Sequence, residues 1–508
     1  MKKIKMVIMI LLPLVLVQVV LLAVVRYVPK TVYGYISVFI VDRILPWYLQ
    51  AARRGARSAM ISSNLAGGDC LNVGCVPSKA LIRCARMIRE VRKAKSEEEF
   101  GVKISGEVEV DFAQIMRRMR KLRSEIAPID GHTRGEEIGV HVYQGFGRFV
   151  SPDTIEVSEV GKDPIHLKFR KAAICTGGRA KIPGDIEGLK EAPFTTNETL
   201  FNLSKLPSHI VVLGSGVVAL EMAQTFATFG SRVSVLVRGE QLFPRSDPDA
   251  GKLIQECLEE NSKVEFLTKS KITKVHTIKQ AEDEADLPLM KISIDQDGNA
   301  LDIETDCLLV AAGRVPNVEN LNLDAASVEY DLNRGVIVDD ESKSVSNSNV
   351  YSVGDCTAGV PRLTHMSGEM AKVVIQNALF DDDWKLSSLV VPSCMYTEPE
   401  FASVGTLNAS EDDVDVWVTS IEHNDRAILD SDKDGYVKIL CKKGTGTIVG
   451  CSILGSRAGE LINEVTLAIK NDISLENIGR NIHCYPTTGE AIMGCGIQLI
   501  NSKWKLLD

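Results

Sequence analysis

The stretch that decides the fold is IVVLGSGVVA at residues 210–219. Its first four residues are apolar, which is typical of a buried strand, and a glycine-rich turn follows them. The three key positions of that turn are Gly214, Gly216 and Ala219. A helix-forming run then extends to Phe229, and an apolar run at 232–237 predicts a second strand. Strand, glycine turn, helix and strand in this order form the βαβ unit that binds a dinucleotide, although a plain packing turn would share part of the pattern.

The end of the second strand bears on which dinucleotide binds. An acidic residue there would hydrogen-bond the ribose 2′-hydroxyl of NAD, but the strand ends with Val237 and Arg238, and Arg245 follows. Arginine suits a 2′-phosphate, so the pattern favours NADPH over NADH, while two solvated surface arginines are the alternative. A further buried strand at 308–312 leads into Gly313, which we add to the expected NAD(P) residues.

A second informative stretch is GGDCLNVGCVPSK at residues 67–79. It places Cys70 and Cys75 five positions apart, and Cα atoms five apart in a regular helix are roughly 8.6 Å from each other. A disulfide tolerates at most about 7 Å, so a bridge requires irregular backbone, which Gly74 permits. A bridge over so short a loop stabilises little and suits electron storage. A metal-binding pair or two unrelated packed thiols are the alternatives.

Composition narrows the functional classes. A chain of 508 residues is expected to form several domains. The net charge is −9 without a long basic run, which argues against nucleic acid as a partner. Most of the twelve cysteines stand in apolar surroundings and indicate buried thiols in a reducing compartment. Four examples are Cys175, Cys307, Cys441 and Cys451.

The N-terminus departs from this picture. Residues Met6–Val25 are apolar except for Gln18, and about 20 helical residues cross a bilayer. The run is longer than that of a signal peptide and lacks an evident cleavage site. The pattern predicts an N-terminal transmembrane helix and a single-pass membrane protein, with basic residues on both flanks that leave the orientation open. Residues 33–48 are also apolar and aromatic, and they could lie at the membrane interface or begin the next domain.

Periodicity predicts further elements. Helices are expected at 49–57, 77–95, 112–126 and 458–470. Strands are expected at 59–61, 140–149, 154–159 and 171–175, and another at 349–355 ends in the carboxylate Asp355.

Taken together, these motifs resemble the flavoprotein pyridine nucleotide–disulfide oxidoreductases, which include dihydrolipoamide dehydrogenase, glutathione reductase and mercuric reductase. The cysteine stretch, the Gly214 turn, the Asp355 segment and YTEPE at residues 396–400 occur in family order. The likeness runs from about Gln50 to Ile492, and it is strongest to mercuric reductase, which resembles this chain in having valine where many relatives carry a tyrosine gate.

The resemblance implies an α/β fold with two Rossmann-like nucleotide-binding domains and an α+β dimerisation domain. The expected parts are a membrane anchor at 1–30, a first FAD-binding segment at 31–200 and an NAD(P)-binding domain at 201–325. A second FAD-binding segment is expected at 326–390 and the dimerisation domain at 391–508, which would form a homodimer.

The resemblance also implies a route for electrons from NADPH through FAD to the Cys70–Cys75 disulfide. Cys75 would lie against the flavin and Cys70 would attack the substrate. Lys79 would sit near the reactive flavin nitrogen, paired with Glu221, because a buried lysine needs a carboxylate to stay charged. Residues expected to contact FAD are Gly67, Gly68, Lys79, Gly147, Thr176, Gly177 and Asp355. Glu221 also belongs to the expected NAD(P) residues.

Two departures concern FAD. The family's first strand and glycine-rich FAD loop should fall at residues 39–44, where this chain has no glycine, and we expect that strand and loop to be missing. Bulky side chains there would block a pyrophosphate, and Asp42 would repel it. The acid expected for the FAD ribose falls at Ser62. An alternative first exon would leave the same pattern.

The third departure concerns proton transfer. The family's disulfide reductases use a histidine before Pro-Thr, paired with a glutamate, whereas Tyr485 stands here and Glu490 is kept. A phenol with a pKa near 10 returns protons poorly at neutral pH. His483 could face the same side and substitute, or be an ordinary tail residue. The chain also ends without the cysteine pair of mercuric reductase, so dedicated mercury reduction is not expected.

Two functional hypotheses follow. In the first, the chain is a membrane-anchored, FAD-dependent, NADPH-using oxidoreductase that reduces a disulfide, a thiol-bound metal or a similar acceptor. In the second, it is a flavin-poor family member that binds nucleotide and dimerises without turnover.

Overall fold

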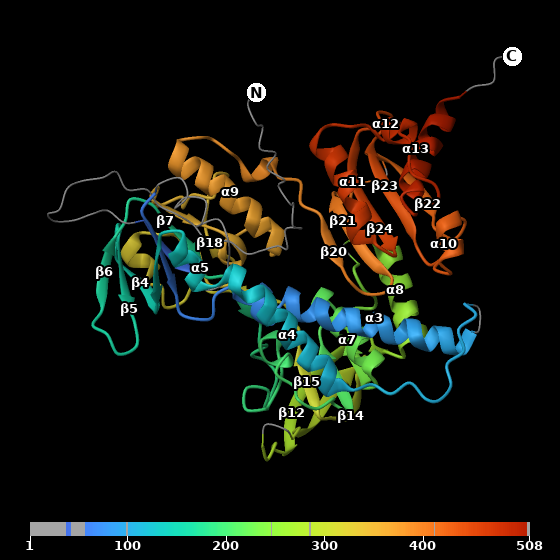
Figure 1. Cartoon of the computed structure of the whole chain (residues 1–508), viewed down its shortest axis with the longest axis horizontal. Coiled ribbons are helices and arrows are strands. Elements are labelled where there is room, and N and C mark those ends of the chain that lie inside the picture. The colour runs from blue at the N-terminus through green and yellow to red at the C-terminus, as the bar shows by residue number, and fades with distance from the viewer. Residues whose placement is uncertain are drawn as a thin grey trace, which may run out of the picture. The chain divides into compact units, whose positions relative to one another are not determined.

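The computed structural model describes residues 37–41, 56–97, 100–244, 246–283, 286–410 and 412–504, with the backbone alone for 37–41. The chain divides into two compact units, and each is built from three separate segments (Figure 1). Unit 1 comprises Met1–Cys70, Ile129–Gly177 and Pro316–Leu386. Unit 2 comprises Leu71–Pro128, Gly178–Val315 and Ser387–Asp508.

Unit 1 contains a five-stranded parallel sheet with the order β19-β7-β1-β2-β3. Its strands are β1 (Ser37–Val41), β2 (Ser58–Ser62), β3 (Val140–Gln144), β7 (Ala172–Cys175) and β19 (Val350–Ser352). All residues of β2, β7 and β19 are buried, as expected for parallel strands covered on both faces.

The first strand of this sheet corrects one prediction. The sequence was expected to lack it, yet β1 lies at the centre, where Val38 is aligned with Ala172 of β7 and Ser37 with Ser58 of β2. Backbone pairing does not require glycine, so its absence here did not remove the strand. The residues of the expected FAD loop, 42–44, and most of the helix predicted at 49–57 lie outside the described residues.

The remaining described elements of unit 1 surround this sheet. They are α5 (His132–Glu137), β4 (Phe146–Ser151), β5 (Thr154–Ser158), β6 (Ile165–Lys168), η1 (Leu323–Ala326), β17 (Tyr330–Asp331), β18 (Gly335–Val336), η2 (Gly354–Cys356), α9 (Thr364–Phe380) and η3 (Leu386–Ser388), whose last two residues fall in unit 2. Strands β4, β5 and β6 form an antiparallel sheet. The rings of Phe149 and Phe169 pack edge to face beneath it, with centroids 6.0 Å apart.

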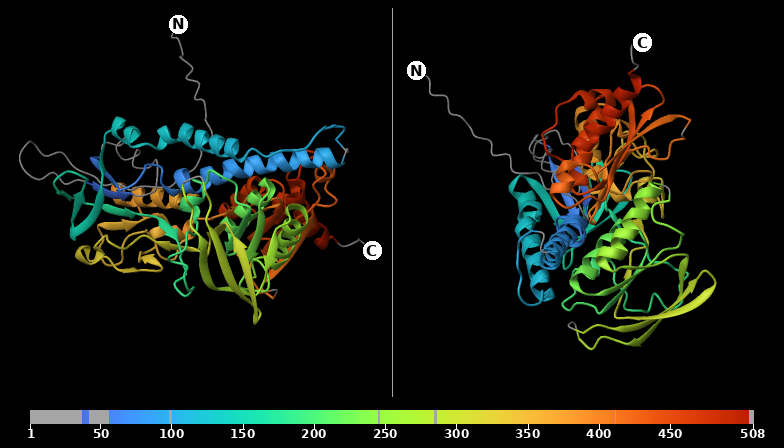
Figure 2. Two further views of the ribbon diagram at one scale, coloured as in Figure 1. Left: turned by 90° about the horizontal axis from the view of Figure 1, so that it is seen from below. Right: turned by 90° about the vertical axis from the view of Figure 1, so that its right-hand side faces the viewer.

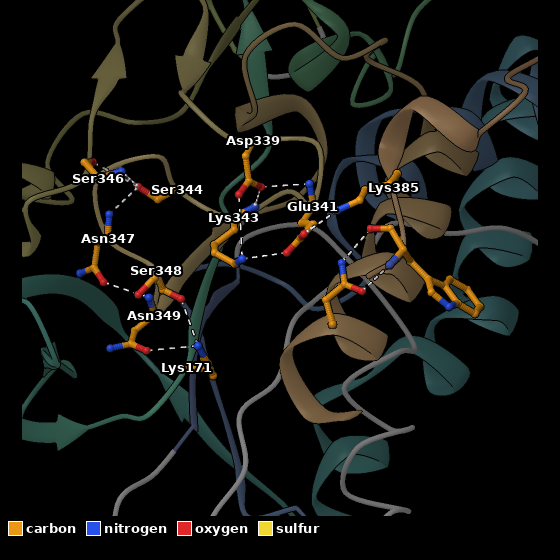
Figure 3. Close-up of polar contacts among 12 residues, drawn as sticks. Lys171, Asp339, Glu341, Lys343, Ser344, Ser346, Asn347, Ser348, Asn349 and Lys385 are labelled. Carbon is orange, nitrogen blue, oxygen red and sulfur yellow. Dashed lines mark hydrogen bonds and ion pairs between the residues drawn. The ribbon is translucent and has the colours of Figure 1, made fainter. Parts of the chain in front are cut away.

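A lysine–carboxylate network fixes the polypeptide around Glu341 in unit 1 (Figure 3). Glu341 accepts hydrogen bonds from Lys343 at 2.7 Å and from Lys385 at 2.6 Å. These two bonds lower the pKa of Glu341 to about 2. Lys171, just before β7, donates to the Ser348 carbonyl at 3.0 Å.

The nucleotide-binding pattern of the sequence forms a parallel sheet in unit 2. Its order is β11-β10-β9-β15, with β9 (His209–Leu213), β10 (Arg232–Leu236), β11 (Glu265–Leu267) and β15 (Cys307–Val310). Helix α7 (Val217–Phe229) connects β9 to β10 and ends at Gly230. The φ of Gly230 is 118°, a value that residues with a Cβ atom rarely adopt. The predicted strand–turn–helix–strand unit is therefore present.

Other elements of unit 2 complete this layer. They are β8 (Gly178–Ala180), α6 (Asn197–Leu200), α8 (Pro248–Ser262), β12 (Ser270–Lys279), β13 (Leu289–Gln296), β14 (Asn299–Thr305) and β16 (Arg314–Pro316), whose last residue belongs to unit 1. Strands β12, β13 and β14 form an antiparallel sheet (Figure 2).

The last segment of unit 2 forms a five-stranded sheet with the order β20-β21-β24-β23-β22. Its strands are β20 (Ser393–Met395), β21 (Glu400–Gly405), β22 (Val414–Ser420), β23 (Tyr436–Lys442) and β24 (Ile448–Gly455), all antiparallel to their neighbours. Its helices are α10 (Asp425–Leu429), α11 (Ala458–Lys470), α12 (Leu475–Arg480) and α13 (Glu490–Lys503). Helix α11 has the predicted bounds.

Two long helices pack on α7. Helix α3 (Cys75–Glu97) follows the short helix α2 (Gly68–Val73), and α4 (Phe112–Asp130) runs beside α3 (Figure 2). Phe112 of α4 meets Phe226 and Phe229 of α7, each with ring centroids 6.1 Å away. These contacts bury the start of α4 against α7.

The membrane predictions need correction. Among the helices of the described residues, none is both long and apolar enough to span a bilayer. This finding overturns the expected transmembrane element of the fold and the expected single-pass membrane location. The stretch that suggested both, residues 6–25, lies outside the described residues.

Candidate functional site

Cys70 and Cys75, the expected redox cysteines, flank a break between two helices. Cys70 is buried within α2, while Cys75 is half-buried and is the first residue of α3. The chain bends at Gly74 between them, so the two residues do not share one regular helix. A disulfide bridge between them would require such a break. Before α2, Gly67 and Gly68 have φ of 86° and 62°, values that favour glycine. Cys75 thus occupies the N-terminal end of a long helix, where negative charge is stabilised.

The structure brings Lys79 and Glu221 together. Nζ of Lys79, one turn after Cys75, lies 2.8 Å from Oε2 and 3.1 Å from Oε1 of Glu221. Glu221 is buried in α7, with 3% of its side chain exposed. Burial by itself would lower the pKa of Lys79, but the Glu221 carboxylate and the neighbouring Cys75 outweigh it and raise that pKa above its usual value.

Sequence reasoning missed Tyr396 as a member of this group. Its backbone N–H donates to Oε1 of Glu221 at 2.9 Å, and its ring centroid lies 4.6 Å from Nζ of Lys79. The available signal was the YTEPE motif, which indicated family membership but named no contact for the tyrosine.

The nucleotide turn has the shape that a pyrophosphate requires. A Cβ on Gly214 would fall 2.4 Å from the carbonyl oxygen of Ala311, so only glycine fits. A Cβ on Gly216 would meet nothing within 4 Å, which leaves the N-terminus of α7 open. Ala219 is fully buried and allows α7 to pack closely on the sheet.

The other expected NAD(P) residues surround the same sheet. Arg238 is exposed, two residues beyond β10. Gly313 follows β15 with φ of 112° and open space where a Cβ would be. Arg245 lies outside the described residues.

Three of the seven residues expected to contact FAD follow strands of the parallel sheet in unit 1, at the edge where α/β sheets bind ligands. Thr176 and Gly177 follow β7. The Thr176 hydroxyl donates to the Asn317 carbonyl, the Thr176 carbonyl accepts from Asn317 Nδ2 at 3.0 Å, and the Gly177 carbonyl accepts the Asn317 N–H at 2.9 Å. Asp355 follows β19, is 5% exposed and comes directly after Gly354, whose φ is 81°. Gly147 differs, because it is a ladder residue of β4 opposite Val157.

These residues fit the flavin end of FAD better than its adenosine end. The buried Asp355 carboxylate can accept hydroxyl groups, and the backbone at Gly67, Gly68 and Gly177, where φ is positive, can approach a bound group closely. Ser62, where the ribose-binding acid was expected, is 3% exposed and its hydroxyl donates to the Asn64 carbonyl at 3.1 Å. A serine at that position supplies no carboxylate for the ribose.

The polar groups of the C-terminal tail each have a partner within unit 2. The Tyr485 hydroxyl donates to Oδ2 of Asp425 at 2.8 Å, which raises the pKa of the phenol. Glu490 accepts the backbone N–H of Thr487 at 3.1 Å. His483 also has a carboxylate partner, since its Nε2 lies 2.9 Å from Oε1 of Glu464.

The other predicted thiols are inert by position. Cys175, Cys307, Cys441 and Cys451 are at most 2% exposed. Burial raises the pKa of Cys307 and Cys441 to about 12 each. No cluster of three or more metal-ligating side chains occurs among the residues described.

Comparison with known proteins identifies the class. Residues 47–371 match the family described as pyridine nucleotide-disulphide oxidoreductase, and residues 391–494 match its dimerisation domain. The chain therefore belongs to the pyridine nucleotide-disulphide oxidoreductase family, whose members use FAD and NAD(P)H.

Individual relatives are distributed over several activities. The chain is 33% identical to the mitochondrial dihydrolipoyl dehydrogenase of Pisum sativum over 456 residues, which covers 87% of both proteins. It is 29% identical to a mercuric reductase of Lysinibacillus sphaericus over 462 residues, or 90% of this chain and 81% of that protein. The solved structure of LpdA from Mycobacterium tuberculosis shares the fold, with a TM-score of 0.79, 22% identity and coverage of 92% and 99%.

Proposed function

We propose that this chain is an NADPH-dependent flavoprotein oxidoreductase that delivers an electron pair to a Cys70–Cys75 disulfide and on to a disulfide, a thiol-bound metal or a similar acceptor. The observation that carries the proposal is the ion pair between Lys79, one helical turn from Cys75, and the buried carboxylate of Glu221. A cation held at that place stabilises an anionic sulfur and an electron-rich ring.

Each group has a task in this proposal. The open turn at Gly216 would receive the pyrophosphate, and Arg238 would receive the 2′-phosphate. Gly67, Gly68, Thr176, Gly177 and Asp355 would hold FAD, with Gly147 as a backbone contact. When bound, FAD supplies a two-electron carrier between the nicotinamide and the disulfide.

A disulfide acceptor would be reduced by two successive thiol–disulfide exchanges. The Cys70 thiolate attacks one acceptor sulfur, a mixed disulfide forms and the first acceptor thiolate leaves. The Cys75 thiolate then attacks Cys70, which re-forms the Cys70–Cys75 bridge and releases the second thiolate. Two protons complete the two product thiols, and a tail residue such as His483 would handle them.

We also propose a homodimer, because the segment from 391 to 494 matches the dimerisation domain of the family. The domain roles follow the predicted boundaries, with FAD binding at 31–200 and 326–390, NAD(P) binding at 201–325 and dimerisation from 391 onward.

A second candidate function is a flavin-poor protein that binds nucleotide without turnover. Ser62 favours it, because its buried hydroxyl already bonds Asn64 and no carboxylate is offered to the FAD ribose.

The visible spectrum of the purified protein separates these candidates. The enzyme is expected to carry the yellow absorption of bound flavin and to develop a long-wavelength thiolate–flavin band when NADPH is added. In Cys75→Ser the band should be lost while the flavin remains. A colourless, folded dimer would rule out the enzyme and leave the second candidate.

A further inference from the structure

The motif at residues 396–400 contacts α3 and α7, the two helices that carry Lys79 and Glu221. On α7, the side-chain amide of Gln224 forms two hydrogen bonds with the backbone of Glu398, one to its carbonyl at 2.8 Å and one from its N–H at 2.9 Å. Gln224 is 3% exposed and follows Glu221 by three residues, so both side chains lie on one face of α7. This amide clamp fixes the motif against the helix that carries the carboxylate.

The motif is also tied to α3 and to its own sheet. The Glu398 carboxylate pairs with Arg89 of α3, and Oε1 of Glu400 lies 3.1 Å from Arg86. The other oxygen of Glu400 accepts the N–H of Gly459 at 3.1 Å, at the start of α11. Thr397 is fully buried and donates to the Pro399 carbonyl at 2.7 Å. Four of the five residues therefore have a bond that holds the loop in place.

The fifth residue, Tyr396, contacts both Lys79 and Glu221. Its N–H donates to Glu221 while the face of its ring lies 4.6 Å from the charged nitrogen of Lys79. An aromatic face within about 6 Å attracts a cation, and more strongly when water is excluded. Lys79 is thus held by the Glu221 carboxylate and by the Tyr396 ring.

We propose that Tyr396 is a positioning residue for Lys79, which it holds charged and next to Cys75. The inference rests on the proposed function, and it assigns to the segment matched as a dimerisation domain a part in building the redox site. The ring limits the directions in which the lysine can swing, and the N–H keeps the carboxylate oriented. If the ring is removed, Lys79 gains freedom, spends less time near Cys75 and stabilises its thiolate less.

The test follows the alkylation of Cys75 by iodoacetamide as a function of pH. Reduced protein in a Cys70→Ser background isolates Cys75, and peptide mass analysis measures its modification. Tyr396→Leu should move the pH profile of alkylation upward by about one unit, because a nearby cation is less firmly held. Tyr396→Phe keeps the ring and the backbone N–H and should preserve the parent profile.

A matched control comes from Lys93, which lies on the same helix as Lys79. Phe100 lies 5.8 Å from Nζ of Lys93, another aromatic–lysine pair, and Phe100→Leu should leave the Cys75 profile unchanged. Equal profiles for Tyr396→Leu and the parent would overturn the proposal. If Tyr396→Leu does not fold, Gln224→Leu, which releases the clamp, serves instead: an upward shift supports the proposal and an unchanged profile overturns it.

The alkylation experiment tests the role of Tyr396 independently of the proposed enzymatic function. Alkylation of a thiol needs neither flavin nor turnover, so it reports on Tyr396 even in a colourless protein. A protein without flavin but with the shifted profile would contradict the enzyme and support the positioning role.

Discussion

Lys79 and Glu221 are 142 residues apart, yet Nζ and Oε2 lie 2.8 Å from each other. Glu221 is 3% exposed. Replacing its carboxylate leaves the half-buried ammonium of Lys79 without its partner. We expect Glu221→Gln to lower the free energy of unfolding by about 2 kcal/mol, and denaturant titration measures it. The pKa of Lys79 should fall as well, because the largest influence that opposes burial is then removed.

The control for this prediction is Glu256→Gln on α8, where the carboxylate is 48% exposed and pairs with Lys252. Exposed pairs contribute little, so the change should stay below about 0.5 kcal/mol. Equal losses for the two variants would show that the Glu221 pair is not a special contact.

Arg238 should discriminate between the two nicotinamide cofactors. It is exposed just beyond β10, and no acidic residue precedes it at the strand end. Arg238→Ala should raise KM for NADPH about tenfold, equivalent to about 1.4 kcal/mol, and leave KM for NADH nearly unchanged. Steady-state kinetics with both cofactors measures the ratio.

Arg232→Ala is the matched control, since Arg232 lies on the same strand and pairs with Glu265 at 3.1 Å. It should affect neither KM. If Arg238→Ala changes both cofactors alike, the choice of NADPH over NADH is wrong.

Part of the fold was predictable from the sequence alone. The bounds of α11 and the unit from β9 to β10 were predictable, because helix and strand periodicity and the Gly230 stop depend on neighbours in the chain. Strand β1 was not, because the prediction depended on glycines that its pairing with β2 and β7 does not need.

Site contacts divide along the same line. The Lys79–Glu221 pair was expected through a family resemblance, while the Tyr396 N–H and ring contacts depend on a loop that comes from a distant segment. The tail gives another contact of this kind, because the Tyr485 hydroxyl bonds Asp425, 60 residues earlier in the chain. Pairings of this kind depend on tertiary packing and leave no local pattern.

Asp247 and Lys438 should contribute to stability within unit 2. Asp247 caps α8 and is 3% exposed, and Lys438 Nζ lies 2.9 Å from its Oδ1. Lys438→Met leaves this carboxylate buried without its cation, with the Ser452 hydroxyl and the Ala250 N–H as neutral partners, and should lower the free energy of unfolding by about 3 kcal/mol. Denaturant titration with Lys252→Met as the exposed control checks this, and equal effects would contradict it.

The tail predicts an asymmetry between Tyr485 and His483. The phenol donates to Asp425 and has a raised pKa, so it should rarely exchange a proton at neutral pH. Tyr485→Phe should keep turnover within about twofold, whereas His483→Gln should lower it about 100-fold. The pH dependence of turnover measures both, and the opposite ranking would assign the protons to Tyr485.

Glu341 should give unit 1 a measurable acid sensitivity. Its pKa is about 2 in the folded chain because Lys343 and Lys385 bond it, against an ordinary value of 4.5. A lowered pKa means that the folded state binds the proton less readily, so the stabilisation is complete above about pH 4.5 and is lost as pH falls toward 2.

Glu341→Gln removes this contribution. It should therefore lower the free energy of unfolding by about 1 kcal/mol at pH 7, a modest value because the carboxylate is partly exposed, and should match the parent near pH 2. The control is Glu369→Gln on α9, an exposed i,i+3 partner of Lys372 that should change stability little at either pH. A difference between Glu341→Gln and the parent that is the same at pH 7 and pH 2 would show that the lysines do not act through the charge of Glu341.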